Sequence, residues 1–345
     1  MIKIIENSLD WSDILALFPN ADIYYTPQYF RSFALNGDGV PQLIYFENNG
    51  AKAINAVFKR QVPICEYGCF FDYTTVYGYG GWLVSDCFNA DNYEKLDSEY
   101  CTVCKENNII SEFVRFHPLI GNAANFKKMY DVSDLGNTVY MDLTGGQEQI
   151  WTSLTGKNRN MIRKAQKLGV KIDKARDKNI FEKFIPIYNS TMDRDNADSY
   201  YYFSNEFYDC IRTELRDNVE VYYAEYDERI IAMAIILNYG KNVHYHLSGS
   251  LAEYKNCAAT NLLLYTVACD YSRLGFSRFH LGGGVGADNN CGLFKFKESF
   301  NKTGLLTFSI GKKIFDRDIY EKLSEFRKSQ NHFDMSARFF PLYRA

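Results

Sequence analysis

The chain has 345 residues, more than one ordinary hydrophobic core holds, and a net charge of −3. Hydrophobic residues make up 46% and charged residues 23%, a globular composition that excludes a disordered chain. The N-terminus lacks the pattern of a signal peptide, and no apolar run approaches the roughly 20 residues that cross a bilayer. We therefore expect a cytoplasmic two-domain protein without a transmembrane segment, in which the nine cysteines are reduced.

The first half of the chain alternates helices and strands. In chain order we expect a strand over 2–5, helices over 11–18 and 27–35, strands over 41–47 and 51–61, a glycine- and tyrosine-rich loop over 72–83, a helix over 91–107 and a strand over 109–119. Pro27 suits the first turn of its helix, because that position has no helical partner for an N–H group.

The second half repeats this plan with longer strands. We expect a strand over 138–143, a basic helix over 157–170, a hairpin of strands over 219–227 and 229–240, a third strand over 241–250, a long helix over 257–274 and a strand over 277–283. Gly275 follows the long helix as its terminating residue.

In both halves, antiparallel strands lead into a unit of strand, loop, helix and strand. This order resembles the GNAT acyltransferase domain. It implies an α+β fold of two tandem GNAT-like domains, each a mixed, mostly antiparallel sheet with flanking helices. We place the first domain, on the acceptor side, at 1–145 and the second at 146–310. Residues 311–345 would form a C-terminal helix and tail that pack back on the first domain.

GNAT enzymes that use coenzyme A have a glycine-containing loop before the long helix, where bare backbone N–H groups bind the pyrophosphate. The equivalent loop here, YKNCAATN at 254–261, has no glycine. We therefore expect weak binding of coenzyme A, and we predict no cofactor. The other glycine cluster, LGGGVG at 281–286, has the spacing of no nucleotide loop and is read as a flexible loop that shapes a cleft.

Two groups of potential metal ligands give only weak evidence for a metal site. Cys101 and Cys104 lie in a helix-like run without a second cysteine pair, and buried helical thiols are the better interpretation. His244 and His246 alternate on a strand and are read as packed or hydrogen-bonded residues. We predict no metal site.

Positive charge is concentrated in the predicted helix over 157–170. Five cations occur there without an acid: Lys157, Arg159, Arg163, Lys164 and Lys167. Helical surfaces normally interleave acids with such cations, so uncompensated charge favours a partner rich in phosphate over a merely solvated face.

The segment GLFKFKESFN at 292–301 contains Lys295 and Lys297, which on a helix point roughly 200° apart. Only one of the two lysines can therefore face a given site. Upstream, Arg194 lies among acids in YNSTMDRDNADSYYYF, a segment dense in groups that bind small polar ligands. The alternative is a helix that ends in a salt-bridged turn, because DRDNADS is rich in capping residues.

Several segments resemble the Fem family of peptidoglycan-bridge aminoacyltransferases. The similar segments are DLTGGQEQIWTSLTGKNRNMIRKAQKLGV at 142–170, GLFKFKESFN, in which Asn301 replaces the family's glycine, and the first-domain patterns VYGYGGWL and VRFHPL. Fem enzymes transfer an amino acid from aminoacyl-tRNA to an amine of a peptidoglycan precursor. This chain is similar to a compact form without the coiled-coil arm of larger members.

The resemblance implies roles for particular residues. Lys297 would stabilise the negative charge that develops on the carbonyl oxygen, with Phe296 packed beside it. Arg194, Tyr77 and Tyr79 would bind the acceptor, a cell-wall precursor linked to uridine diphosphate or lipid. The basic helix would bind tRNA. Two alternatives stay open: an acyl-CoA-dependent N-acyltransferase acting on a sugar nucleotide or surface-polysaccharide precursor, and a non-catalytic RNA-binding module.

Overall fold

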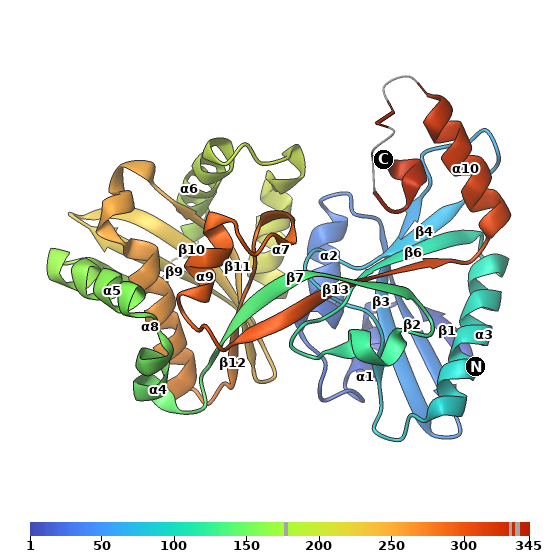
Figure 1. Cartoon of the computed structure of the whole chain (residues 1–345), viewed down its shortest axis with the longest axis horizontal. Helices are drawn as coiled ribbons and strands as arrows, with labels where there is room; N and C mark the ends of the chain where they lie inside the picture. The colour runs from blue at the N-terminus through green and yellow to red at the C-terminus, as the bar shows by residue number, and fades with distance from the viewer. Residues whose placement is uncertain (176–178, 331–332, 335–338) are drawn as a thin grey trace. The chain divides into compact units, whose positions relative to one another are not determined.

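The computed structural model describes residues 1–175, 179–330, 333–334 and 339–345. The chain divides into two compact units. Unit 1 comprises Met1–Leu135 and Phe308–Ala345, and unit 2 comprises Gly136–Thr307. Both termini therefore belong to unit 1, whereas unit 2 is one continuous segment of chain (Figure 1).

The sheet of unit 1 has the order β1-β2-β3-β4-β6-β13, with β5 paired to β3. Its strands are β1 (Ile2–Ile5), β2 (Val40–Asn48), β3 (Ala51–Gln61), β4 (Phe71–Thr74), β5 (Leu83–Val84), β6 (Ile109–Arg115) and β13 (Leu305–Ile314). Strands β4 and β6 are parallel, and the other neighbours are antiparallel. A parallel pair needs a crossover, which here contains a helix.

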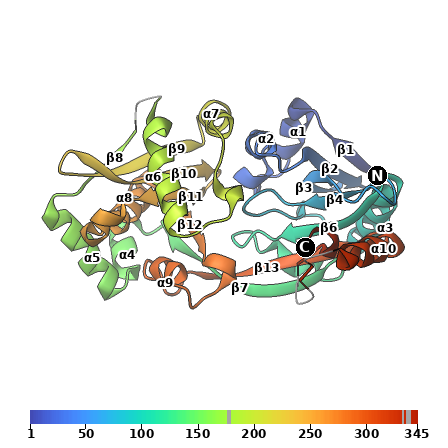
Figure 2. The ribbon, with the colours of Figure 1, turned by 90° about the horizontal axis from the view of Figure 1, so that it is seen from above.

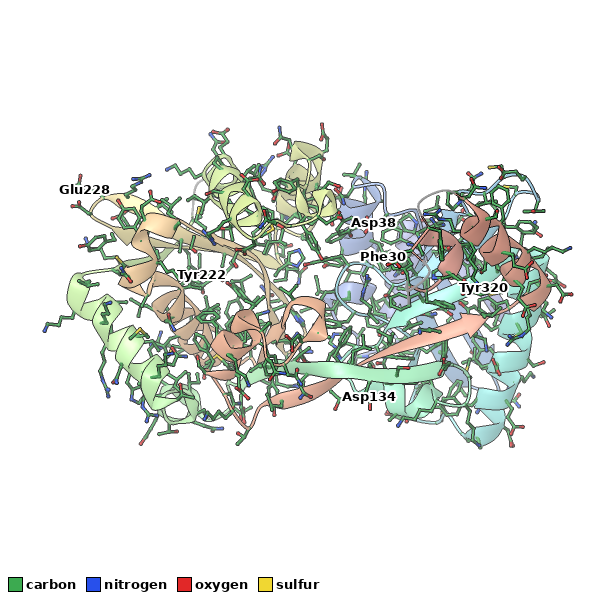
Figure 3. The ribbon with its side chains drawn as sticks, turned by 45° about the horizontal axis from the view of Figure 1, so that its top comes forward. Phe30, Asp38, Asp134, Tyr222, Glu228 and Tyr320 are labelled. Atoms are coloured by element: carbon green, nitrogen blue, oxygen red, sulfur yellow. The ribbon has the colours of Figure 1, made fainter. Side chains whose placement is uncertain are left out.

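The described part of unit 1 forms four α-helices: α1 (Ser8–Leu15), α2 (Pro27–Ala34), α3 (Ala90–Glu106) and α10 (Arg317–Ser329). As predicted, Pro27 occupies the first turn of α2, after a Thr26 side chain that caps the helix. Phe30 on the same helix is fully buried (Figure 3). The crossover helix α3 packs Tyr100 edge-on against Trp82, so it covers the core of the sheet.

The sheet of unit 2 has the order β7-β12-β11-β10-β9-β8. Its strands are β7 (Asp131–Asp142), β8 (Lys171–Lys174), β9 (Val219–Tyr226), β10 (Arg229–Tyr239), β11 (Asn242–Ser250) and β12 (Arg278–Gly283). Here β11 and β12 are parallel and the other neighbours are antiparallel. Unit 2 thus repeats the plan of unit 1, with one parallel pair in an otherwise antiparallel sheet.

The α-helices of unit 2 are α4 (Gly146–Ser153), α5 (Gly156–Leu168), α6 (Ile180–Arg194), α7 (Asn205–Glu214), α8 (Ala259–Arg273) and α9 (Gly292–Glu298). The crossover between β11 and β12 contains α8, which packs on β9 and β10. Gly275 follows α8 with φ of 80°, a left-handed conformation that suits glycine and ends the helix as predicted. Tyr222 of β9 is fully buried in the core beneath α8 (Figure 3).

The fold prediction is confirmed: the chain has two GNAT-like α+β units with mixed, mostly antiparallel sheets. Two local predictions are wrong. The glycine- and tyrosine-rich segment is not wholly a loop, because Asp72–Thr74 belongs to β4 and Leu83 to β5. Strand β13, which the sequence reasoning did not anticipate, crosses the boundary that we placed between residues 310 and 311.

The nine cysteines are all free thiols, as predicted, and Cys104 is buried in α3. Among the described residues, every helix is too short or too polar to cross a lipid bilayer.

Candidate functional site

The two lysines of α9 face different environments. The helix is capped by Cys291, whose Sγ atom accepts a hydrogen bond from the Phe294 N–H group. Lys297 is 9% exposed, whereas Lys295 is half-exposed and pairs with Glu298 at 3.4 Å. The opposed orientation predicted from the helical phase is confirmed, and Lys297 is the inward lysine.

The side chain of Lys297 reaches from α9 to the end of β12. Its Nζ atom donates a hydrogen bond to the carbonyl oxygen of Gly283, the last residue of that strand, at 2.7 Å. Burial lowers the pKa of Lys297 to about 8, and the nearby Cys291, a smaller influence, acts in the opposite direction. The ammonium form therefore predominates at neutral pH, although water around it is largely excluded.

The pairing of strands β11 and β12 stops before either strand ends, so that the two strands part. Three residue pairs join them, of which the last is His244 with His280. Strand β11 nevertheless continues to Ser250, and β12 continues to Gly283. Beyond the last pair, the facing backbone groups of the two strands are not joined by the parallel ladder. Such groups can hydrogen-bond to an extended ligand.

A β-bulge lies where the strands part. Ile235 and Ile236 of β10 face Leu247 and Tyr245 of β11, so His246 faces no residue of β10. Bulges re-aim side chains and are frequent beside active sites. Burial, followed by the influence of His244, lowers the pKa of His246 to about 3, so its imidazole is neutral.

The sequence reasoning missed the bulge and the parting of the strands. One signal was available, since Gly249 interrupts a β-rich run and glycine within a strand marks a bulge or a close approach. A Cβ atom at this position would lie 2.6 Å from the carbonyl oxygen of Ile187. Gly249 therefore lets α6 approach β11 closely.

Arg194 lies at the same edge of the sheet as Lys297. Its NH1 atom donates to the carbonyl oxygen of Ser250, the last residue of β11, at 3.0 Å. Because β11 and β12 are parallel, their final residues, Ser250 and Gly283, lie at the same edge. The fold thus places two predicted site cations at the ends of neighbouring strands. Arg194 also pairs with Asp195 at 3.5 Å, which is the salt-bridged helix end considered as the alternative.

The predicted basic helix is α5, and its five cations differ in their contacts. Lys157, Lys164 and Lys167 are exposed. Arg159 instead donates through NH1 to the carbonyl of Leu154 at 2.7 Å and so satisfies the end of α4. The guanidinium of Arg163 lies 5.1 Å from the ring centre of Trp151.

The start of α5 is joined to the end of α9. The Thr155 N–H group donates to the carbonyl oxygen of Ser299 at 2.9 Å. Thr155 caps α5, and Ser299 immediately follows α9. The basic helix and the helix that carries Lys297 are therefore direct neighbours. Phe296, on the same turn of α9, packs edge-on against Phe300 at 5.3 Å and against the core of unit 2.

Tyr77 and Tyr79 belong to unit 1. Tyr77 stacks on Phe33 at 5.4 Å, and its carbonyl oxygen accepts a hydrogen bond from the Tyr29 hydroxyl. Tyr79 packs edge-on against Tyr24 at 5.4 Å. Both tyrosines are partly buried in an aromatic cluster, and burial raises the pKa of Tyr79.

The loop before α8 has an unusual backbone. Ala258 adopts φ of 54° and ψ of 34°, a left-handed conformation, and the first turn of α8 has no side-chain cap. This residue supplies the turn that glycine provides elsewhere, at the cost of the strain of a Cβ atom in that region. The loop therefore presents first-turn N–H groups although it contains no glycine.

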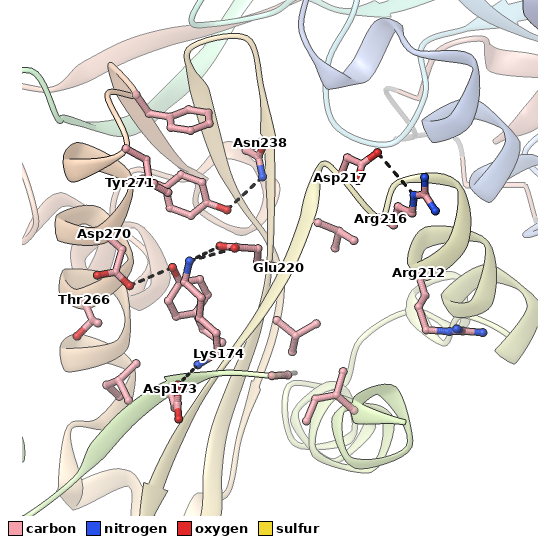
Figure 4. Close-up of a pocket in the computed structure, with 18 of the residues that line it drawn as sticks. Asp173, Lys174, Arg212, Arg216, Asp217, Glu220, Asn238, Thr266, Asp270 and Tyr271 are labelled. Carbon is pink, nitrogen blue, oxygen red and sulfur yellow. Dashed lines mark hydrogen bonds and ion pairs between the residues drawn. The ribbon is translucent and has the colours of Figure 1, made fainter. Parts of the chain in front are cut away.

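A cavity of about 740 Å³ with both polar and apolar walls lies near the starts of β9 and β12 rather than near Lys297. Figure 4 shows Lys174 there between acidic and aromatic groups, with two arginines across the cavity. The Lys174 ammonium contacts Glu220 at 2.8 Å and lies over the ring of Tyr222 at 5.0 Å. The Tyr222 hydroxyl in turn donates to Asp270 at 3.2 Å. These charges are largely paired within the protein.

Comparison with known proteins agrees with this topology. Residues 155–297 match the acetyltransferase (GNAT) domain family, a range that runs from the cap of α5 to Lys297. No curated protein sequence matches the chain. The solved structure of FemX is similar over 93% of this chain and 99% of its own, with a TM-score of 0.70 and 14% identity.

Two further structures share the fold. The C-terminal domain of a putative lysylphosphatidylglycerol synthetase from Agrobacterium fabrum has a TM-score of 0.56 and 14% identity, over 89% of this chain and 91% of its own. A tandem GNAT protein from the clavulanic acid biosynthesis pathway has a TM-score of 0.51 and 9% identity, over 91% of this chain and 99% of its own. Residues 155–297 thus match a GNAT acetyltransferase domain, and the chain as a whole has a fold similar to that of FemX.

Proposed function

We propose that this protein transfers an aminoacyl group from an aminoacyl-tRNA to an amine of a cell-wall precursor linked to uridine diphosphate or lipid. The observation that carries this proposal is the buried ammonium of Lys297, held at the end of β12 where β11 and β12 part. A solvated surface lysine would serve RNA binding, whereas a buried one is suited to charge that develops during a reaction. This position also argues against a non-catalytic RNA-binding module.

The proposed reaction is an ester aminolysis. The acceptor nitrogen attacks the ester carbonyl carbon, and negative charge develops on the carbonyl oxygen, where the Lys297 ammonium would donate a hydrogen bond. The bond between the carbonyl carbon and the ribose oxygen then breaks, and the tRNA hydroxyl leaves with the proton that the amine has lost, returned by the water or carboxylate that accepted it. The attacking amine gives its proton to water or to a carboxylate of the substrate, so no side-chain base is required.

The donor and acceptor assignments rest on charge. Lys157, Lys164 and Lys167 are exposed on α5, which adjoins α9, so RNA phosphates on α5 would bring the ester toward Lys297. Arg194 would bind the phosphate of the acceptor at the same sheet edge, because a guanidinium forms paired hydrogen bonds with phosphate oxygens.

The two lysines of α9 provide the test. Transfer from a mixture of aminoacyl-tRNAs to a uridine-diphosphate-linked precursor is measured for Lys297→Ala and for Lys295→Ala. We expect Lys297→Ala to lower kcat by about 10²–10³-fold with little change in the acceptor KM, whereas Lys295→Ala keeps full turnover. Lys297→Met removes the ammonium but keeps an apolar side chain that packs like the lysine stem, so it tests the charge separately from the packing. Full turnover by both alanine variants would remove Lys297 from the mechanism.

An acyl-CoA donor is the second candidate. The match to an acetyltransferase domain and the uncapped first turn of α8 favour it. We expect calorimetry with coenzyme A and acetyl-CoA to show no saturable binding at micromolar concentration, because the Ala258 and Ala259 side chains crowd this turn. Tight saturable binding would replace tRNA with acyl-CoA as the donor.

A further inference from the structure

A second pocket in unit 2 lies on the far side of α8 from the sheet strands that it covers, between α4, α5 and α8. Its volume is about 550 Å³. These three helices lie side by side in both views of the molecule (Figures 1 and 2). The pocket is lined by Gln147, Glu148, Trp151, Arg163, Gln166 and Tyr265. It is separate from Lys297 and from the cavity near Lys174.

Contacts within the protein hold the aromatic groups of this pocket in place. The ring centres of Trp151 and Tyr265 are 5.3 Å apart with an angle of 64° between the planes. The Arg163 guanidinium lies over the Trp151 ring at 5.1 Å. Gln147 donates through Nε2 to the Tyr265 hydroxyl at 3.1 Å, which fixes the tyrosine. A flat ligand would therefore meet a preformed stacking surface.

The polar groups of the pocket suit the edge of a nucleobase. Glutamine amides both donate and accept hydrogen bonds, as base edges require, and Glu148 accepts from an exocyclic amine. These polar groups lie at the rim, because the side chains of Gln147, Glu148, Arg163 and Gln166 are all exposed. Aromatic rings and a planar guanidinium stack on unpaired bases of any sequence.

The charge around the pocket favours RNA over an apolar ligand. Arg163 lies on α5, and the exposed Lys164 and Lys167 follow on the same helix, whose sequence has no acid. Phosphates of a strand running along α5 would be neutralised there, while Glu148 of α4 disfavours phosphate inside the pocket itself.

We infer that the pocket between α4, α5 and α8 takes an unstacked nucleobase of an RNA strand whose phosphates lie on α5. This inference rests on the proposed tRNA donor and goes beyond it by assigning a base-binding site. The base stacks with Trp151 and Arg163, and its edge reaches the amides of Gln147 and Gln166.

Trp151 makes the inference measurable. The chain has three tryptophans, and Trp11 and Trp82 are 1% and 0% exposed in the core of unit 1, whereas Trp151 is only partly buried. Titration with a short single-stranded RNA oligonucleotide should quench the fluorescence of Trp151 in a saturable way. The same titration with Trp151→Phe, which keeps a stacking ring, should show unchanged affinity by anisotropy and no quenching.

Paired variants separate stacking from charge. Trp151→Ala should weaken binding between about 5-fold and about 100-fold, the range for loss of one base–aromatic stack. Arg163→Lys keeps the charge and should reduce quenching without changing the salt dependence. Lys167→Ala should have the opposite effects. It should lower the slope of log affinity against log salt by the value of about one phosphate contact, and it should leave the quenching at saturation intact. Melting curves confirm that each variant is folded.

The outcomes distinguish this inference from the proposed function. Salt-dependent RNA binding without Trp151 quenching, and with full affinity in Trp151→Ala, would overturn the base pocket and leave a tRNA donor in place. Quenching by coenzyme A but not by RNA would overturn the RNA assignment. If RNA quenches Trp151 but Lys297→Ala keeps full turnover, the base pocket stands and the proposed catalytic role of Lys297 fails.

Discussion

The ammonium of Lys297 and the carbonyl of Gly283 form a 2.7 Å hydrogen bond that joins α9 to the last residue of β12. This bond fixes the cation at a strand end instead of leaving it on a flexible stem. It also keeps the nitrogen in a buried place, where burial lowers its pKa to about 8. Charge at this position therefore depends on pH in an accessible range.

The pH dependence of turnover follows from that pKa. If the protonated lysine stabilises the oxyanion, kcat should fall as pH rises through about 8, because the ammonium is lost there. Lys297→Arg keeps its charge at every accessible pH, so its residual activity should lack this descending limb. A wild-type rate that stays flat to pH 10 would show that the protonated form is not required.

The salt dependence of RNA binding should report the exposed lysines of α5. Reversing Lys164 and Lys167 to Glu should flatten the slope of log affinity against log salt by roughly two contacts, at about 0.7–0.9 per phosphate. Lys127→Glu with Lys128→Glu is the matched control, since these adjacent lysines are exposed in unit 1. Equal flattening by both pairs would mean that binding is not localised on α5.

The C-terminal tail should stabilise unit 1 through Asp72. This buried carboxylate accepts hydrogen bonds from Arg60 at 2.8 Å, from the Tyr343 hydroxyl at 3.2 Å and from Arg344. Arg344→Ala should lower the free energy of unfolding by about 1.5–3 kcal/mol, the range for a hydrogen bond to a charged group.

Arg317→Ala is the control for this change, because Arg317 is exposed and its pair with Glu321 on α10 is solvated. Denaturant unfolding measures both variants. A loss for Arg317→Ala as large as that for Arg344→Ala would contradict a specific role of the Asp72 contacts.

A buried carboxyl in the core of unit 1 should make stability depend on pH. Glu112 is fully buried and accepts hydrogen bonds from Asn55 at 2.7 Å, Tyr100 at 3.1 Å and Tyr130 at 2.6 Å. Burial nevertheless raises its pKa above the usual 4.5. The folded chain thus keeps a proton that the unfolded chain has lost, so the free energy of unfolding should fall as pH rises from about 4.5 toward the folded pKa.

Glu112→Gln should remove this pH dependence with little loss of stability at pH 7, since the Asn55 amide can turn and offer its Oδ1 atom. Glu112→Leu should be less stable at every pH, because it leaves buried donors without an acceptor, at about 1–3 kcal/mol each. Urea unfolding between pH 4 and pH 8 measures both. An unchanged pH profile in Glu112→Gln would assign the dependence to another group.

Sequence patterns predicted the regular elements because those patterns are local. The Pro27 start of α2, the Gly275 end of α8 and the opposed orientation of Lys295 and Lys297 follow from helical geometry alone. Strand β13 was missed because Gly311, Lys312 and Lys313, near its end, lack the strand pattern. In the fold, a Cβ atom at Gly311 would lie 2.6 Å from the Phe116 ring, so tertiary packing explains the glycine.

The site was predictable only in part for the same reason. Lys297 could be singled out as a candidate because it lies in a recognisable motif. The bulge at His246 depends on how β10 and β11 pair, and the parting depends on β11 and β12, whose connection contains α8. Gly249 is the local signal that points to them. Likewise, the contacts of Arg159 and Arg163 with α4 divide the basic helix into structural and exposed cations only after α4 and α5 pack together.

The division of unit 1 into two segments has a consequence for synthesis on the ribosome. Strand β6 is made early, but its antiparallel neighbour β13 follows about 190 residues later, after all of unit 2. At a translation rate of about 5–20 residues per second, β13 is synthesised on the order of 10–40 seconds after β6. During this time the edge of β6 that later pairs with β13 lacks that neighbour. Unit 2, a continuous segment, can complete its own sheet during that interval. The nascent chain should therefore complete unit 2 first and the sheet of unit 1 last.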